Sequence, residues 1–261
     1  MTDVLIKVDR VNKRLGDRVV LDDVSFEVVD RTRDNLVTGQ VVGILGPSGV
    51  GKTTLMRVVA GLDAPDAGTV TSLAGSHLTD DAGLVFQHYP LLPHRTIRDN
   101  LEVVGRMNGM KRVDARARAD ALLDQFGLGE CAALYPSQVS GGQRQRAAIA
   151  QQVVRPRRLL LLDEPFSGLD PKVLDDVMGV IVEVANLHDW NTILLVTHDV
   201  RAAILVSDTL LLLGRPSPDV GARIQGHYDL VERGLAWHPE LAGSATFAEV
   251  EREVRARFAT L

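Results

Sequence analysis

Residues 46–54 carry the clearest chemical pattern in the chain, because they fit the phosphate-loop motif G-x-x-x-x-G-K-S/T. The glycines allow a tight backbone turn in which several N–H groups can point at phosphate oxygens. Lys52 would reach the β- and γ-phosphates of a nucleotide, and the hydroxyl of Thr53 would bind Mg²⁺. The predicted nucleotide-binding residues of this loop are Gly46, Pro47, Ser48, Gly49, Val50, Gly51, Lys52, Thr53 and Thr54.

The residues around this loop have the pattern that the motif requires. The apolar residues 41–45 predict a buried strand, and residues 55–60 predict a helix. The start of that helix would add unpaired N–H groups and the positive end of its dipole. A glycine-rich turn with a chance lysine is the alternative, and the flanking strand and helix disfavour it.

A second charged element follows the four leucines at 159–162, which predict a strand buried on both faces. Asp163, at the carboxyl end of this strand, could hold Mg²⁺, and Glu164 could polarise a water for in-line attack on the γ-phosphate. The alternative is a surface turn, since Asp-Glu-Pro is turn-like. The phosphate loop earlier in the chain favours the catalytic interpretation.

Residues 140–143, Ser-Gly-Gly-Gln, are the third element, and they open a predicted helix that ends near Val154. A serine and two glycines at a helix start can form a second anion-binding N-terminus. Taken alone, the same residues are also typical of an ordinary N-cap with a flexible entry.

The remaining pattern alternates strands with helices, which predicts a parallel sheet covered on both faces. A helical insertion is expected between two of its strands, at 100–110 and 113–126, and a turn is expected at residues 22–23. The predicted strands are 4–8, 19–21, 24–28, 41–45, 69–71, 83–86, 159–162, 193–196 and 210–213, and a further helix is predicted at 173–187.

Composition narrows the classes of function. The chain has 261 residues, a net charge of −5 and no block of basic residues, so a nucleic-acid partner is not favoured. Cys131 is the single cysteine, which excludes an intrachain disulfide and favours a reducing compartment. The first residues lack a signal-peptide pattern and the apolar runs are too short to span a bilayer, so we expect a cytosolic protein.

Together these motifs resemble the ATP-binding subunit, or nucleotide-binding domain, of an ABC transporter. The phosphate loop, Gln87, residues 139–143, 159–164 and 167–170, and His198 stand in that family's order and spacing, over about residues 4–213. The resemblance implies an α/β fold: a RecA-like P-loop NTPase core (about 1–87 and 156–214) with an N-terminal antiparallel β subdomain. It also implies a helical signature subdomain (about 88–155) and a C-terminal tail with a helix (215–261), all within one ABC ATPase domain.

The resemblance also implies a role for each motif residue. Glu164 would be the general base, and His198 would hold the γ-phosphate and the attacking water. Asp170 would signal across a dimer. The implied Mg²⁺ ligands are Thr53, Gln87 and Asp163, with Gln87 also sensing the membrane subunit. The residues implied to bind the nucleotide held by the other copy are Ser140, Gly141, Gly142 and Gln143, the first three of them through its γ-phosphate.

The implied activity is hydrolysis of ATP with Mg²⁺ to drive transport, and the implied partner is a second copy that sandwiches two ATP molecules. Transmembrane permease subunits, and indirectly a solute-binding protein, would place the chain on the inner face of the cell membrane. Residues 86–93 and 163–166 resemble the nitrate, sulfonate and taurine import group. A soluble ABC-type ATPase and the cassette of a lipid or efflux system remain alternatives; a small-molecule kinase would lack the signature and His198.

Some positions depart from the family pattern or lie outside it. Leu15 stands where the family has an aromatic residue that stacks on adenine, which predicts weaker discrimination between bases. The polar loop at 30–38 is longer than expected. In the tail, Thr246 and Glu249 predict a capping box. A helical stripe that should pack on the body is formed by Phe247, Val250, Val254 and Phe258.

Overall fold

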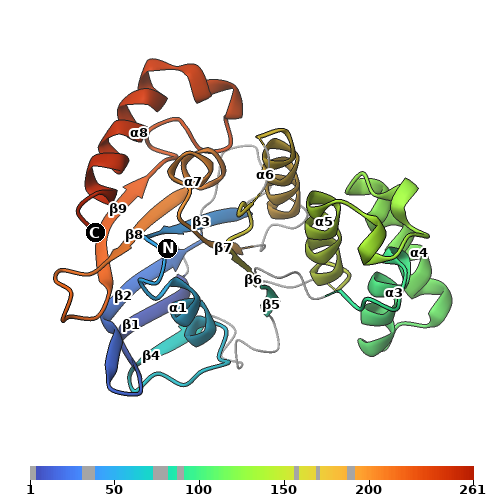
Figure 1. The fold of residues 1–261 in the computed structure, drawn as a ribbon, viewed down its shortest axis with the longest axis horizontal. Helices are drawn as coiled ribbons and strands as arrows, with labels where there is room; N and C mark the ends of the chain where they lie inside the picture. Colours follow the sequence, from blue (N-terminus) through green and yellow to red (C-terminus); the bar gives the residue numbers. More distant parts are fainter. Residues whose placement is uncertain are drawn as a thin grey trace.

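The computed structural model describes residues 4–30, 39–72, 82–86, 91–155, 159–168, 171–186 and 192–261, with the backbone alone at 171–173 and 239–240. Two sheets form the framework (Figure 1). The larger sheet has six strands in the order β5 (Ala82–Val85), β6 (Leu159–Asp163), β7 (Thr192–Thr197), β3 (Gln40–Leu45), β8 (Thr209–Gly214) and β9 (Arg223–Asp229). The smaller sheet is β2 (Arg18–Val29), β1 (Val4–Leu15) and β4 (Ala67–Ser72).

The larger sheet is parallel from β5 to β8, as predicted. Strands β3, β6, β7 and β8 are buried along their whole length because core clusters cover both faces. Alternate residues divide between the faces: Leu160 and Leu162 join one cluster, whereas Leu159 and Leu161 join the other. Strand β9 adds an antiparallel edge to β8, and its polar sequence, Arg-Ile-Gln-Gly-His-Tyr-Asp, did not predict a strand.

The smaller sheet is antiparallel, and its β1–β2 hairpin turns at Gly16, where φ is 59°. The predicted turn at residues 22–23 is wrong, because β2 continues through these residues as one strand. Asp23 has a φ of 55° and its N–H donates to Asn12 Oδ1 at 3.1 Å, where the strand register is irregular. The two acidic residues therefore distort the strand locally without reversing the chain.

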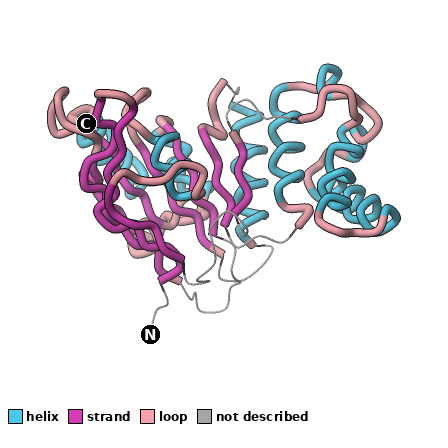
Figure 2. The backbone as a smooth tube through the Cα atoms, turned by 90° about the horizontal axis from the view of Figure 1, so that it is seen from below, coloured by secondary structure: helices cyan, strands magenta, loops and turns pink. Residues whose placement is uncertain are grey.

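The predicted helical insertion is confirmed, since the described residues between β5 and β6 include three α-helices, which gather on one side of the molecule (Figures 1 and 2). They are α3 (Ile97–Met107), α4 (Arg112–Gln125) and α5 (Gly141–Gln152), with 3-10 turns at Gly129–Cys131 and Pro136–Gln138. Helix α3 begins a turn earlier than predicted because Thr96 caps it, its Oγ1 accepting from Asp99 N. Helices α1 (Lys52–Val59), α6 (Pro171–Ala185) and α7 (Val200–Val206) belong to the sheet region.

The C-terminal segment, with a 3-10 turn at Pro239–Gly243 and helix α8 (Ala245–Phe258), packs against the body as predicted. Phe247, Val250 and Val254 are fully buried in the core cluster that contains α7. The predicted capping box is wrong: Ser244 is the N-cap, and its Oγ accepts from Phe247 N at 3.1 Å. Thr246 lies within the helix, so its hydroxyl is not needed as a cap.

Candidate active site

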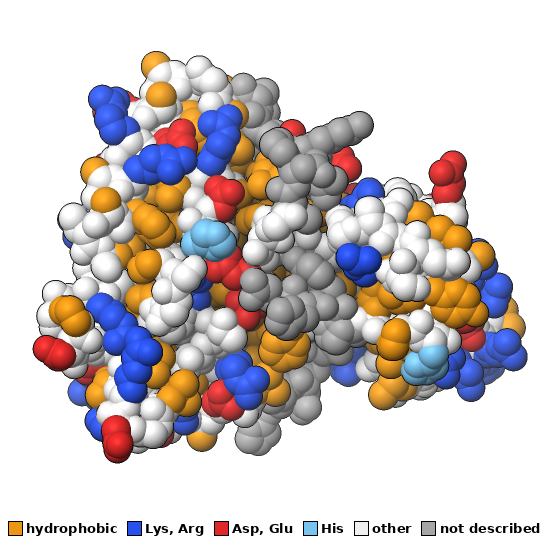
Figure 3. Space-filling model, viewed as in Figure 1, with side chains coloured by type: hydrophobic (Ala, Val, Ile, Leu, Met, Phe, Trp, Pro, Cys, Tyr) orange, Lys and Arg blue, Asp and Glu red, His pale blue; other side chains and the backbone are white. Residues whose placement is uncertain are grey.

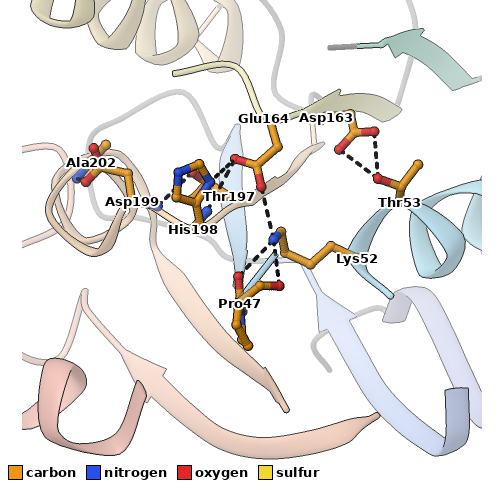
Figure 4. A network of polar contacts seen from close by, with 10 residues as sticks. Pro47, Lys52, Thr53, Asp163, Glu164, Thr197, His198, Asp199 and Ala202 are labelled. Carbon is orange, nitrogen blue, oxygen red and sulfur yellow. Dashed lines mark hydrogen bonds and ion pairs between the residues drawn. The ribbon is translucent and has the colours of Figure 1, made fainter. Parts of the chain in front are cut away.

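Charged side chains from adjacent strands meet at one edge of the larger sheet (Figure 4). Asp163 ends β6 and Glu164 follows it, His198 follows β7, and the phosphate loop follows β3. Because β6, β7 and β3 are parallel neighbours, their carboxyl ends open at the same edge. In the space-filling view, acidic side chains and a histidine lie together near the middle of this face, with basic side chains above and below (Figure 3).

The phosphate loop forms the predicted strand, turn and helix. Gly51 precedes α1 with a φ of 124°, a conformation that side chains oppose, and an added Cβ there would lie 2.9 Å from Val20. The first residue of the loop is hydrogen-bonded to the end of β7, since Gly46 N donates to Thr197 O at 3.2 Å. Its geometry is therefore fixed by β7 on one side and by β2 on the other.

Lys52 places a buried cation at the centre of this loop. Its Nζ lies 2.8 Å from Gly46 O, 3.2 Å from Pro47 O and 3.0 Å from Glu164 Oε1. The side chains of Lys52 and Glu164 are 6% and 11% exposed, so solvent screens the pair weakly. The ammonium group is thus positioned where a phosphate oxygen could replace one of its present partners.

Thr53 and Asp163 form a second polar pair beside it. Thr53 Oγ1 donates to Asp163 Oδ2 at 2.9 Å and lies 3.2 Å from Oδ1. Burial raises the pKa of the Asp163 carboxyl; the Thr53 hydrogen bond opposes this, Glu164 adds to it, and Lys52 opposes it. A hydroxyl and a carboxylate are hard oxygen ligands of the kind that Mg²⁺ prefers, so the pair fits this ion.

Glu164 joins Lys52 to His198. Its Oε2 lies 2.8 Å from His198 Nδ1 and accepts from the backbone N–H of His198 at 3.3 Å. Its backbone has a φ of 50°, unusual for a residue other than glycine, and is held by a hydrogen bond from Glu164 N to Val196 O. The strained backbone directs the carboxylate toward both the lysine and the histidine.

These residues open onto a cavity of about 330 Å³. Leu15, the residue at the predicted adenine-stacking position, lies in its wall and is 56% exposed. Sequence reasoning missed Arg18, Val20 and Arg215, which also line the cavity. Arg215 was detectable in principle, because it follows the apolar strand β8 in the same way that Asp163 ends β6.

The signature residues lie elsewhere. Ser140 caps α5 in a reciprocal capping box: its Oγ accepts from Gln143 N at 3.2 Å, and Gln143 Oε1 accepts from Ser140 N at 2.8 Å. Ser140 and Gly141 are exposed, and none of residues 140–143 lines the cavity of its own chain. Gln87 and Asp170, also predicted from the sequence, lie outside the described residues.

Comparison with known families identifies the fold. The family model described as "ABC transporter" matches residues 29–167. The chain belongs to the ABC transporter family. It is 41% identical over 221 residues to the sulfate/thiosulfate import ATP-binding protein CysA of Mycolicibacterium paratuberculosis, covering 82% of this chain and 58% of that protein. It is 37% identical over 252 residues to the aliphatic sulfonates import ATP-binding protein SsuB of Burkholderia ambifaria, covering 97% and 71%.

Solved structures agree with this assignment. A dimeric post-hydrolysis state of the ATP-binding cassette MJ0796 bound to ADP and Pi matches with a TM-score of 0.70 and 28% identity, covering 87% of this chain and 99% of that one. The predicted ABC ATPase fold is therefore confirmed. The chain spans 58% to 59% of the length of the CysA relatives from mycobacteria. Among the described residues, no helix combines the length and apolar character needed to cross a membrane.

Proposed function

We propose that the chain binds and hydrolyses ATP as the cassette subunit of a bacterial ABC transporter, powering transport, and import in particular, by ATP-driven closure of a dimer. The observation that carries this is the position of Glu164, whose carboxylate lies between Lys52 and His198 at the mouth of the phosphate loop. This arrangement places a candidate base, a phosphate-binding cation and a polar histidine around one point.

In this proposal the backbone N–H groups of the loop hold the phosphates and Lys52 binds the β- and γ-phosphates. When Lys52 pairs with the γ-phosphate, its ion pair with Glu164 breaks. The Glu164 carboxylate is then free to accept a proton from the attacking water. His198 holds the γ-phosphate and this water. In this proposal Glu164 is held by Lys52 before ATP binds and becomes available as a base once ATP is bound.

Mg²⁺ would be held by Thr53 and Asp163, with Gln87 as the expected third ligand. The ion would neutralise charge on the phosphate oxygens as the terminal bond breaks. The direct Thr53–Asp163 contact supports these two assignments.

The signature of a second copy would complete each site. Ser140 and Gly141 are exposed, residues 140–143 lie outside their own chain's cavity, and the structural relatives are dimers, which supports contact with ATP on the partner's loop. Asp170 would signal across this interface. ATP binds the closed form better and so shifts the population toward it, and hydrolysis reverses the shift.

The partners would be permease subunits in the membrane and, indirectly, a solute-binding protein, with this chain on the cytoplasmic face. The names of the CysA and SsuB relatives support import. Within the single domain, residues of about 88–155 would form the helical signature subdomain between the two parts of the core.

The transport role is tested by purifying the tagged chain from gently solubilised native membranes. Recovery of a multi-span membrane protein, ideally with a solute-binding protein, supports a transporter. Recovery of ribosomes or DNA-bound proteins, or of no partner, would favour a soluble ABC-type ATPase and contradict the transport role without affecting the hydrolytic site.

A further inference from the structure

Arg215 lies at the same edge of the sheet as the site, where it follows β8 as the other site residues follow or end β6, β7 and β3. Strand β8 pairs in parallel with β3, and Arg215 comes directly after β8. An added Cβ on Gly46 would lie 2.5 Å from Leu213 O, so the end of β8 abuts the start of the phosphate loop. Arg215 therefore enters the cavity beside the loop, from the side opposite β7.

The segment after Arg215 is fastened to β2, which keeps this arginine at the cavity wall. Ala222 exchanges backbone hydrogen bonds with this strand, donating to Val20 O at 2.9 Å and accepting from Asp22 N at 3.0 Å. Arg223 adds an ion pair with Asp22 at 2.6 Å. Arg215 thus belongs to the part of the cavity formed by the β1–β2 hairpin, next to Val20.

The guanidinium of Arg215 has hydrogen-bond donors that are poorly satisfied. Its Nη2 is buried with no hydrogen-bond partner among the described residues, and Nη1 has one long contact, 3.4 Å to Val220 O. Burial and the nearby Arg18 both lower the pKa of this group, so its surroundings disfavour the positive charge. A buried unpaired donor is costly, and a ligand acceptor reached by rotating the side chain would remove that cost.

The described residues that line the cavity offer Arg215 no free carboxylate. Glu164 is the only acidic residue among them, and it is paired with Lys52 and His198. The hairpin side of the cavity offers the apolar Leu15 and Val20 and a second cation, Arg18. This side can take an electron-rich group larger than phosphate.

We propose that Arg215 binds the nucleotide directly, donating to acceptors of its nucleoside monophosphate part: the α-phosphate, the ribose or the base. The inference rests on the proposed function, because it requires that the loop hold the β- and γ-phosphates. Arg215 then secures the end of the nucleotide that lies against Leu15, where the described lining of the hairpin side has no aromatic ring to stack on the base.

The test compares the binding of ATP and of inorganic pyrophosphate, without turnover, by calorimetry. Arg215→Ala should weaken ATP binding about tenfold, as loss of a charge-assisted hydrogen bond does, and leave pyrophosphate binding unchanged. Arg215→Lys, which keeps the charge without the planar fork, should recover part of the loss. Arg255→Ala is the matched control: it removes the same charge from an ion pair with Glu251 outside the cavity, and it should leave both affinities unchanged.

Nucleotides with different bases then show which part of the nucleotide Arg215 contacts. An equal loss with ATP, GTP and CTP assigns it to the ribose or α-phosphate, whereas a loss that differs between bases assigns it to the base. Unchanged ATP affinity in a folded Arg215→Ala protein, or an equal loss for pyrophosphate, would overturn the inference alone. A wild-type protein that binds no ATP would overturn the proposed function and this inference with it.

Discussion

The phosphate-loop region and the signature region handle their polar groups in opposite ways. Around the loop, Lys52, Asp163 and Glu164 are buried and paired with one another and with their neighbours. At the start of α5, Ser140 and Gly141 are exposed, and the cap uses only residues of the signature itself. One region assembles reactive charges inside the chain, whereas the other presents helix N–H groups outward. The proposed function requires both regions in one complete site, and the outward-facing signature supports their coming from two chains.

Substitutions in the phosphate-loop region should have the largest effect on ATP turnover. Lys52→Ala and Glu164→Gln should each reduce ATP turnover by at least about a hundredfold, since each removes a group that acts on the transferring phosphate or its water. Phosphate release measures this. Lys7→Ala, which alters an exposed pair with Glu27, is the control and should keep wild-type turnover. Unchanged hydrolysis in both site variants would contradict the assignment.

Glu164→Gln has a second expected consequence, because it should bind ATP without consuming it. In excess Mg-ATP this variant should accumulate as a dimer, measured by light scattering during gel filtration. If it stays monomeric at micromolar concentration, the sandwich model does not hold for the isolated chain.

Mixing two inactive variants should then restore activity if the two regions belong to different chains. Gly141→Asp places a carboxylate at the exposed helix start, where an added Cβ has only Arg144 Nη2 at 4.0 Å nearby, so the fold should survive. A mixed dimer with Lys52→Ala has one intact loop facing one intact signature. Random assortment of equal amounts should restore roughly a quarter of wild-type turnover. No recovery despite dimer formation would place both regions of each site in one chain.

Asp163→Asn should affect ATP turnover and thermal stability in opposite ways in the phosphate-loop region. Because burial raises the pKa of the Asp163 carboxyl, the folded protein favours the neutral form, and the ionised form destabilises it as pH rises above the ordinary carboxyl pKa. The variant should lose turnover and yet unfold at an equal or higher temperature at neutral pH with chelator present. This advantage should disappear in acid. A clear loss of thermal stability at neutral pH would contradict this explanation.

The smallest effects concern two serine caps with the same local chemistry. Ser140→Ala and Ser244→Ala should each reduce the free energy of unfolding by about 1 kcal/mol, measured in urea. Only Ser140→Ala should also lower turnover, because neither Ser244 nor any residue of the helix that it caps lines the cavity. Thr246→Ala, inside α8, is the control. Equal effects of both caps on turnover would remove the functional distinction between them.

Much of this arrangement follows from local patterns. The phosphate loop, the leucine strand before Asp163 and the helical insertion were predicted because glycine spacing and continuous apolar runs have few structural solutions. The contacts of Glu164 with Lys52 and His198 required the fold, since these residues are far apart in the chain and meet only through the strand order. The predicted trans role of residues 140–143 stays a prediction.

The misses have a common physical cause, which is that a distant partner decided the structure. Strand β9 is too polar to predict alone and forms because β8 offers an open edge. Residues 22–23 remain within a strand because Asn12 and Ala222 pair with them. Ser244 caps α8 in place of Thr246, and it does so next to Phe247, whose ring is buried in the distant core cluster. Arg215 depends on the cavity, which no local pattern describes.

The central position of β3 also has a consequence for biosynthesis. Its residues 40–45 pair with β7 at 192–197 and with β8 at 209–214, so the strand that carries the phosphate loop has no partner until most of the chain exists. At ribosomal speed the wait is on the order of ten seconds. A nascent chain that stops before β8 should therefore have no stable affinity for ATP. The nucleotide would stabilise finished molecules and leave truncated ones exposed to proteolysis.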